Sequence, residues 1–230
     1  RSITWENIII SQWSVSGTKR TCGIITGHVY CWGDNAYGQL GDGTTKAQLK
    51  PVRAEGALAG EKVTAMFAAQ YHNCAVASGE VYCWGLNNHG QLGDNTTTDR
   101  LSPVKVAGPW AAGTVTDVGG TSFVSCAIAA GKIYCWGDNE QGMVGVNDSA
   151  TPINDYRTPV LVKTAPTIPN GLSATYTATS LSSGSRSSNM CAVADSKAYC
   201  WGPNNIGQIG DIALTRRRVL TANNAAGAPN

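Results

Sequence analysis

The chain has 230 residues, enough for a sizeable hydrophobic core, and only 14% of them are charged. It contains 27 glycines, each costing a helix interior about 1 kcal/mol relative to alanine, so the composition favours a turn-rich β-protein. The net charge of +2 excludes a strong electrostatic attraction to nucleic acid. The lack of long apolar runs excludes a membrane span. The sequence has no signal-peptide pattern and begins with arginine, so we expect a processed product whose export signal lies outside it.

The first segment with a β pattern is TWENIIISQWSVSG, residues 4–17, which is rich in β-branched and aromatic residues. We expect a strand here. It is either the outer strand of a first structural unit or a strand that closes a ring.

Four similar segments follow along the chain. They are HVYCWGDNAYGQLGDGTT from His28, EVYCWGLNNHGQLGDNTT from Glu80, KIYCWGDNEQGMVG from Lys132 and KAYCWGPNNIGQIG from Lys197. Their cysteines are spaced by 52, 52 and 65 residues, and self-similarity at such a period is typical of repeat architectures. We therefore interpret residues 1–230 as a single repeat domain with units at about 1–59, 60–112, 113–164 and 165–230.

The eight cysteines form four pairs of identical spacing: Cys22 and Cys31, Cys74 and Cys83, Cys126 and Cys135, Cys191 and Cys200. A turn signal lies at the middle of each pair, and a two-residue turn at Ser78-Gly79 places Cys74 opposite Cys83 in an antiparallel hairpin. Partners at a non-hydrogen-bonded site have Cα atoms about 4.5 Å apart, within the range of a disulfide. We predict four disulfides, each worth about 2.5–3 kcal/mol.

Zinc ligation and free thiols are the competing interpretations of the cysteines. Zinc is disfavoured because there is no C-x-x-C and the only histidines are His28, His72 and His89. Free thiols leave four identical spacings unexplained. Four disulfides require an oxidising compartment, so we expect an extracellular or cell-surface protein.

Each predicted hairpin has two apolar faces, one with the cysteines and branched residues and one with alanine, tyrosine and tryptophan. Such a sheet is covered on both sides, and sheets of about 50 residues stacked around an axis are the blades of a β-propeller. We predict an all-β fold, a β-propeller or partial propeller arc of about four blades, each holding a disulfide-bridged hairpin. The aromatic residues of the expected blade core are Tyr30, Trp32, Tyr82, Trp84, Tyr134, Trp136, Tyr199 and Trp201.

The pattern VYCWGDNAYGQLGDGTT, preceded by TCGIITG, resembles the repeat of the regulator of chromosome condensation family, whose members form β-propellers. HNCAVASGEVYCWGLNNHGQLGDNTT is the best copy, and the four units cover roughly residues 8–223. The cysteine pairs and low charge look closer to secreted, largely bacterial relatives with the C-W-G signature. Nuclear members are nucleotide-exchange factors for a small GTPase, but no exchange residue can be placed here and disulfides argue against that compartment.

The resemblance leaves the closure of the propeller open, because family members commonly have seven blades. Four blades close into a small ring, another chain completes the arc, or further sequence supplies the rest. The fourth repeat is 13 residues longer than the others, and its excess falls in TAPTIPNGLSATYTATSLSSGSRSS, residues 164–188. We expect a surface loop there, either without a function or as a contact loop on the binding face.

The sequence contains no Ser/His/Asp constellation, paired carboxylates or phosphate loop, and its glycines recur with the repeats. We therefore predict no catalytic residues, no metal, no cofactor and no enzymatic activity. Positions identical in all copies are explained by the blade, so specificity is expected where the copies differ. One such position, on a turn at one rim, holds Tyr37, His89, Gln141 and Ile206. Ordinary surface variation is the alternative.

Together these features predict a secreted or cell-surface propeller module for protein–protein binding, with another protein or further copies of itself as the partner. A place in an adhesin or surface appendage is one form of this hypothesis. The alternatives are an extracellular enzyme inhibitor and a glycan-binding, lectin-like propeller. No nucleic acid partner and no membrane span within this chain are expected.

Overall fold

A computed structural model describes residues 10–15, 19–146, 155–163, 175–182, 184, 188–210 and 217–222; for 10–15 and 217–222 only the backbone is described. These residues form four separate four-stranded antiparallel sheets, which we name blades 1 to 4 in chain order. In the described ranges the only helical element is one 3-10 turn, η2 (Gly56–Leu58), so no helix there is long and apolar enough to cross a membrane. The all-β fold is confirmed.

Within every blade the strands follow chain order from one edge of the sheet to the other. Blade 1 consists of β1 (Ile10–Val15), β2 (Arg20–Ile25), β3 (His28–Gly33) and β4 (Gln48–Arg53). Blade 2 consists of β5 (Val63–Ala68), β6 (His72–Ala77), β7 (Glu80–Gly85) and β8 (Arg100–Lys105). Blade 3 consists of β9 (Val115–Gly120), β10 (Val124–Ala129), β11 (Lys132–Gly137) and β12 (Tyr156–Leu161). Blade 4 consists of β13 (Ala178–Leu181), β14 (Met190–Ala194), β15 (Lys197–Gly202) and β16 (Arg217–Ala222).

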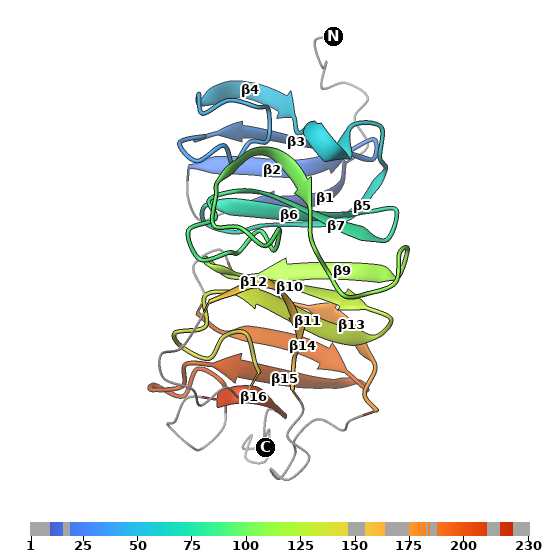
Figure 1. Cartoon of the computed structure of the whole chain (residues 1–230), viewed down its shortest axis with the longest axis vertical. Helices are drawn as coiled ribbons and strands as arrows, with labels where there is room; N and C mark the ends of the chain where they lie inside the picture. The colour runs from blue at the N-terminus through green and yellow to red at the C-terminus, as the bar shows by residue number, and fades with distance from the viewer. Residues whose placement is uncertain are drawn as a thin grey trace, which may run out of the picture.

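The blades stack in chain order around an axis. The first strands of successive blades, β1, β5, β9 and β13, lie next to one another, as inner strands of a propeller do. Figure 1 shows blade 1 (blue) and blade 4 (orange to red) at opposite ends of the stack. The described blades therefore form an open arc, and the alternative of a closed four-bladed ring is wrong.

Two segments differ from the sequence-based expectation. β1 was expected as an outer or ring-closing strand, but it pairs with β2 of its own repeat and lies on the inner side, because the chain meanders outward from it. Within the expected loop 164–188, residues 178–181 form β13, the inner strand of blade 4. The blade needs an inner strand, and tertiary pairing with β14 makes the run ATSL that strand, although only Thr179 in it is of a type enriched in strands.

The four disulfides of the predicted hairpins are confirmed, and no cysteine is free. In blade 2, Cys74 is opposite Cys83 with Cα atoms 4.1 Å apart, the short distance of a non-hydrogen-bonded pair. The turn residues Ser78 and Gly79 have φ of 51° and 69°, as a type I′ turn requires. That turn sets the register and thereby brings the two sulfur atoms together.

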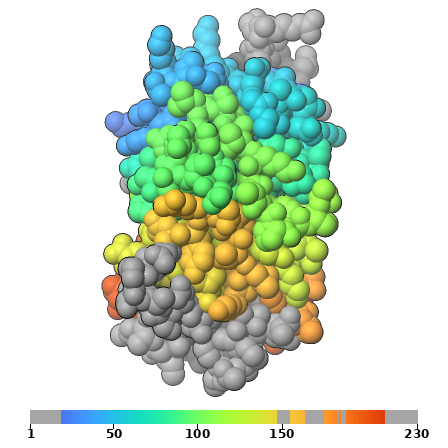
Figure 2. All heavy atoms as spheres, in the orientation of Figure 1, coloured from blue at the N-terminus to red at the C-terminus, as the bar shows by residue number. Residues whose placement is uncertain are grey.

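Successive blades pack the cysteine face of one against the alanine and aromatic face of the next. Between blades 2 and 3, for example, Cys74, Val76 and Val81 contact a surface that includes Ala127 and Trp136. The same pairing of faces occurs between blades 1 and 2 and between blades 3 and 4. Figure 2 shows the described blades as successive bands of one continuous body. The core therefore consists of three equivalent layers between sheets.

Each layer contains the same hydrogen bond from a tryptophan to the preceding blade. The indole Nε1 of Trp136 donates to the carbonyl oxygen of Gln91 at 2.9 Å, and a Cβ at Gly93 would lie 2.7 Å from that nitrogen. Equivalent bonds join Trp84 to Gln39 at 3.0 Å and Trp201 to Met143 at 2.7 Å. We call this combination of packed faces, indole bond and glycine the blade joint.

The contribution of a disulfide to stability depends on whether a joint covers it. Replacing Cys126 and Cys135 by alanine is expected to lower the free energy of unfolding by about 3–5 kcal/mol, because a loop constraint is lost and a gap opens between blades 3 and 4. The matched control replaces Cys191 and Cys200, which have the same sequence separation of 9 residues. Its loss should be only about 2.5–3 kcal/mol in guanidinium unfolding; equal losses would contradict the packing argument.

Replacing a glycine of the blade joint by alanine is expected to cost more stability than replacing another glycine of positive φ. Gly93→Ala brings a Cβ against Trp136 and Val106, whereas Gly60, at φ +85°, has nothing within 4 Å. Gly60→Ala should cost about 1–2 kcal/mol for backbone strain alone. Gly93→Ala should lower the free energy of unfolding by a further ~1–3 kcal/mol, because the indole must move. Chemical denaturation of both variants measures the difference.

Candidate functional site

The strand ends form two further edges of every blade, and one of these edges carries the long loop between its third and fourth strands. Because the strands alternate in direction, the connections β3–β4, β5–β6, β7–β8 and β9–β10 emerge at the same edge, and the two-residue hairpin turns emerge at the other. We call the first edge the loop face. The candidate rim residues of the sequence analysis lie in loops of this face.

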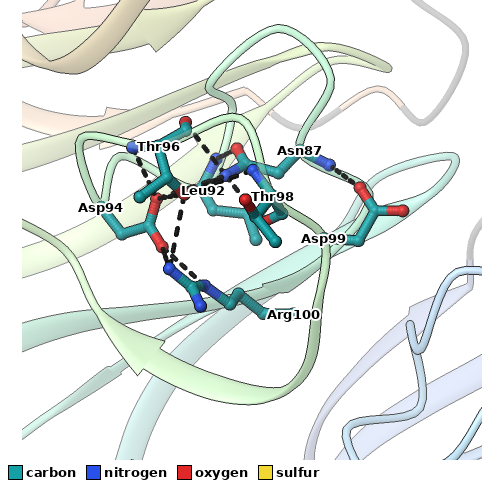
Figure 3. A network of polar contacts seen from close by, with 7 residues as sticks. All are labelled: Asn87, Leu92, Asp94, Thr96, Thr98, Asp99 and Arg100. Atoms are coloured by element: carbon teal, nitrogen blue, oxygen red, sulfur yellow. Dashed lines mark hydrogen bonds and ion pairs between the residues drawn. The ribbon is translucent and has the colours of Figure 1, made fainter.

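The β7–β8 loop is held in shape from within by Asn87 (Figure 3). Its side-chain nitrogen donates to the carbonyl oxygens of Thr96 and Thr98, each at 3.1 Å, and its side-chain oxygen accepts from the amide of Leu92 at 2.9 Å. Asn35, Asn139 and Asn204 accept the corresponding amide bond in the other blades. The asparagine common to all copies is therefore a loop organiser.

Asp94 closes the outer part of this loop (Figure 3). Its carboxylate accepts from the hydroxyl of Thr96 at 2.6 Å and pairs with Arg100 at 2.7 Å. Burial alone would raise the pKa of Asp94, but these hydrogen bonds and the Arg100 charge together lower it. Asp94 is thus a structural anion that keeps the loop rigid at neutral pH.

Four aromatic rings from three blades adjoin one another on the loop face. Tyr37 of blade 1 meets Tyr71 of blade 2 edge-on with centroids 5.3 Å apart, and His89 of blade 2 lies 5.2 Å from Phe123 of blade 3. Tyr71 and Phe123, 6.2 Å apart, link the two pairs. Tyr37 is 38% exposed and the other three rings are half-buried. We call this row the aromatic ridge.

The ridge follows from two positions of the repeat. Tyr37 and His89 occupy the rim position, while Tyr71 and Phe123 each lie three residues before the first cysteine of their repeat. Each of the two pairs crosses a joint between neighbouring blades in the same way. Sequence analysis missed Tyr71 and Phe123, although comparing the copies at this second position would have found them.

A buried arginine positions the β5–β6 loop that carries Tyr71. Arg20 of blade 1 is 4% exposed and donates to the carbonyl oxygens of Ala69, Gln70 and His72 at 2.8–2.9 Å. Burial lowers the pKa of Arg20 to about 9, although Asp34 opposes the shift, so the side chain stays charged at neutral pH. This clamp joins blade 1 to blade 2 directly below the ridge.

Gln70 extends this support to the next blade. Its side-chain nitrogen donates to the Tyr71 hydroxyl at 2.7 Å, and its side-chain oxygen accepts from the Ser122 hydroxyl at 3.1 Å. Ser122 precedes Phe123, so one glutamine holds both central rings of the ridge. The surface is therefore preorganised.

His89 also lies beside two carboxylates of blade 3. Its Nδ1 atom is 2.9 Å from Asp155, and His89, Asp138 and Asp155 can each place one ligand atom within 4.8 Å of the others. Burial raises the pKa of Asp138, although the Glu140 amide and His89 oppose this. Among the described residues this is the group of side chains that could hold a cation. The sequence analysis did not predict a metal site. The hydrogen bond between His89 and Asp155 accounts for the arrangement of these two side chains without one.

The remaining predicted residues fall outside the ridge. Gln141 is half-buried and Ile206 is 81% exposed, and neither lies within an aromatic contact. Among the aromatic residues of the expected core, Trp84, Trp136 and Trp201 have no exposed surface, and Tyr82 and Tyr199 are buried. Tyr30, Trp32 and Tyr134 are half-buried.

Comparisons with known proteins agree with this architecture. The model of the regulator of chromosome condensation (RCC1) repeat matches residues 26–76 and 78–128, and a second model of the same repeat matches residues 63–91. Residues 26–128 therefore contain RCC1 repeats. The matched regions run from the β2–β3 turn of blade 1 into β10 of blade 3.

Several curated proteins share the repeat. The mouse X-linked retinitis pigmentosa GTPase regulator is 35% identical over 131 residues, 55% of this chain and 13% of the relative. Human E3 ubiquitin-protein ligase HERC2 is 27% identical over 215 residues, which are 91% of this chain and 4% of the relative. The Arabidopsis thaliana ultraviolet-B receptor UVR8 is 32% identical over 143 residues, which are 60% of this chain and 32% of the relative. The chain thus spans at most a third of these relatives.

Solved RCC1-type propellers have the same fold. Human WBSCR16 superposes with a TM-score of 0.79 at 20% identity, over 100% of this chain and 56% of that one. Yeast RCC1 (Prp20) bound to Kap60 superposes with a TM-score of 0.76 at 20% identity, over 97% of this chain and 51% of that one. The chain therefore has about half the length of these propellers.

Acid is expected to destabilise the fold through His72, which lies beneath the ridge. Its Nε2 atom is 2.8 Å from the Ser125 hydroxyl, and burial together with the Arg20 charge lowers the pKa of His72 to about 3. The unfolded chain takes up this proton near pH 6.5 and the folded chain does not, so stability falls as pH decreases from about 6.5 towards 3.

The slope of this loss should be on the order of 1 kcal/mol per pH unit. His72→Gln is the matched variant, because all carboxyl groups titrate equally in both proteins. Urea unfolding would be measured between pH 7 and pH 4, which is about the range between the unfolded and folded pKa values of His72. The free energy of unfolding should fall less steeply with decreasing pH in the variant. Parallel curves for the two proteins would contradict the role given to His72.

Proposed function

We propose that this chain is an extracellular protein-binding propeller module that contacts its partner through the aromatic ridge. The observation that carries the proposal is the row of four adjoining rings, Tyr37, Tyr71, Phe123 and His89, drawn from three blades. Aromatic residues dominate the energetics of protein interfaces because they bury large areas at little entropic cost. Buried hydrogen bonds below the ridge hold it in one shape before binding.

The relatives support binding rather than catalysis. RCC1-repeat proteins are mostly regulators or binders, and the yeast RCC1 structure contains a second protein, Kap60. One relative is a ubiquitin ligase, but this chain covers only 4% of it, so that activity is not carried over. Exchange activity on a GTPase is not proposed either.

The four disulfides support the extracellular location. A protein in a reducing compartment would not keep four cross-links of this kind. Three of the bridges, Cys22–Cys31, Cys74–Cys83 and Cys126–Cys135, consist of cysteines with no exposed surface. Secretion, display on a cell surface and the likeness to bacterial C-W-G proteins belong to this proposal. A place in an adhesin or appendage would follow if the bound partner were a surface component.

Tyr71→Ala and Phe123→Ala are expected to weaken partner binding by at least about tenfold each, as interface anchors do. Oxidised wild-type chain and the double variant would be immobilised in parallel and exposed to extracellular protein from the source cells. Proteins retained by wild type alone would then be titrated by biolayer interferometry. Leu49→Ala is the matched control, because Leu49 is 98% exposed and lies on β4, outside the ridge.

Unchanged melting curves would show that the variants fold, since the rings are partly exposed. A partner that binds the double variant and wild type equally would contradict the ridge as the binding site. Loss of an enzyme's activity on binding would identify the chain as an inhibitor.

A glycan is the second candidate ligand, because exposed aromatic rings beside polar groups also suit sugars. The favouring observation is that the exposed Tyr37 and the half-exposed His89 and Asp155 share the loop face. Saturable binding on a glycan array, lost in both Tyr37→Ala and His89→Ala, would establish this alternative over a protein partner.

A further inference from the structure

Three side chains of types that bind metal ions converge on the loop face where blade 2 meets blade 3. His89 comes from the β7–β8 loop, Asp138 directly follows β11, and Asp155 directly precedes β12. Each can place one ligand atom within 4.8 Å of the other two. The Nδ1 atom of His89 is 2.9 Å from Oδ2 of Asp155. The group therefore joins two blades through one imidazole and two carboxylates.

The register of blade 3 brings the two carboxylates together. Gly137 and Tyr156 are paired at the end of the ladder between β11 and β12. The next residue along one strand and the preceding residue of the other, Asp138 and Asp155, therefore leave the sheet at the same point. The Asp138 amide also donates to the carbonyl oxygen of Phe123 at 3.0 Å, which fixes its position. The joint then places the β7–β8 loop of blade 2 beside this pair.

Asp138 lacks the partners that a buried carboxylate needs. It is 9% exposed, and its Oδ1 atom accepts from the Glu140 amide at 2.7 Å. In the described part of the chain its second oxygen accepts no hydrogen bond, and neither Asp138 nor Asp155 pairs with a lysine or arginine. Buried charges in proteins are paired or coordinate metals. The bond between His89 and Asp155 thus explains those two side chains but leaves Asp138 uncompensated.

The repeat itself does not require this combination of side chains. The same three positions hold different residues at the other two joints: Tyr37, Leu86 and Asp99 between blades 1 and 2, and Gln141, Pro203 and Arg216 between blades 3 and 4. Asp99, the counterpart of Asp155, accepts from the Asn87 amide at 2.8 Å within its own loop. Among the three joints of the described arc, the middle one alone combines an imidazole with two carboxylates.

We propose that His89, Asp138 and Asp155 bind a zinc ion that bridges blades 2 and 3 beside the aromatic ridge. Zinc is bound by imidazole nitrogen and carboxylate oxygen, and sites with three protein ligands keep a fourth position open for water or another group. Calcium and magnesium prefer sites built from oxygen ligands alone. The proposal goes beyond partner binding at the ridge and does not depend on it.

The observed geometry is close to that of a zinc site. Two ligand atoms about 2.0–2.1 Å from one zinc ion lie roughly 3.0–3.4 Å apart. The distance of 2.9 Å between His89 and Asp155 is already near this range. Both side chains are 34% exposed, so they have room to move by the distance that brings all three ligand atoms around one ion. Asp138 is the buried, fixed member of the set.

The test is a calorimetric titration of zinc chloride into the oxidised, metal-stripped full chain at neutral pH. We expect one equivalent of zinc to bind. Asp138→Asn and Asp155→Asn should each raise the zinc dissociation constant at least about tenfold, because each removes a charged ligand atom. Calcium and magnesium chloride should not compete with zinc at equal concentration, because the imidazole is a poor ligand for both ions.

The histidine rings provide a second readout that identifies the ligand directly. The chain contains three histidines, so their ring signals can be followed separately by NMR. Zinc should shift the ring signals of His89 and leave those of His28 and His72 unchanged. His28→Gln is the matched control and should bind zinc like wild type, because the His28 ring contacts Arg53 on β4, outside the site.

Zinc should also stabilise the joint that it bridges. At a zinc concentration about a hundredfold above the dissociation constant, the melting temperature should rise by about 5–10 °C, and the rise should be absent in Asp138→Asn. Melting curves without metal show whether the variants fold. Because Asp155 is exposed, Asp155→Asn keeps the test valid even if Asp138→Asn disturbs the fold.

Four results would overturn the proposal. They are the absence of binding at millimolar zinc, binding that both asparagine variants leave unchanged, a shift of the His28 ring instead of the His89 ring, and calcium binding as tight as zinc binding. The titration contains zinc and the chain alone. Its failure therefore does not bear on the ridge as a partner surface, and failure to find a partner does not bear on the zinc site.

Discussion

The rest of the structure depends on the contact between the cysteine face of one blade and the tryptophan face of the next. A four-stranded sheet of this kind is apolar on both sides and cannot be stable alone. The joint buries both surfaces, and the indole bond to Gln91 or its equivalents fixes the distance and rotation between blades. A glycine such as Gly93 leaves room for the ring, so two distant motifs of the repeat act as one unit.

The loop face takes its shape from these joints. The contacts of Tyr37 with Tyr71 and of His89 with Phe123 each cross from one blade to the next, so the rings adjoin only because the joints place the blades. Arg20 and Gln70 then hold the loops from below and limit their motion. Recognition in such a fold is a property of neighbouring repeats rather than of one loop, which explains how a common scaffold serves unrelated partners.

A blade that buries its faces only against neighbouring blades exposes a face wherever no neighbour covers it. In the described arc, Val193 of blade 4 is 37% exposed, whereas its counterpart Ile128 in blade 3 has no exposed surface. The disulfides stabilise each hairpin internally, but they cannot cover a face.

The sequence by itself determined the repeat, the hairpin register, the four disulfides and the propeller-type fold. These are local consequences of turn residues such as Ser78-Gly79 and of alternation over a few residues, which need no knowledge of distant contacts. Only the tertiary structure decided that β1 and β13 are inner strands, that the blades form an arc, and that Tyr71 and Phe123 join Tyr37 and His89 in one surface. Those features depend on how sheets rotate against one another, and that rotation is set by packing between residues about 50 positions apart.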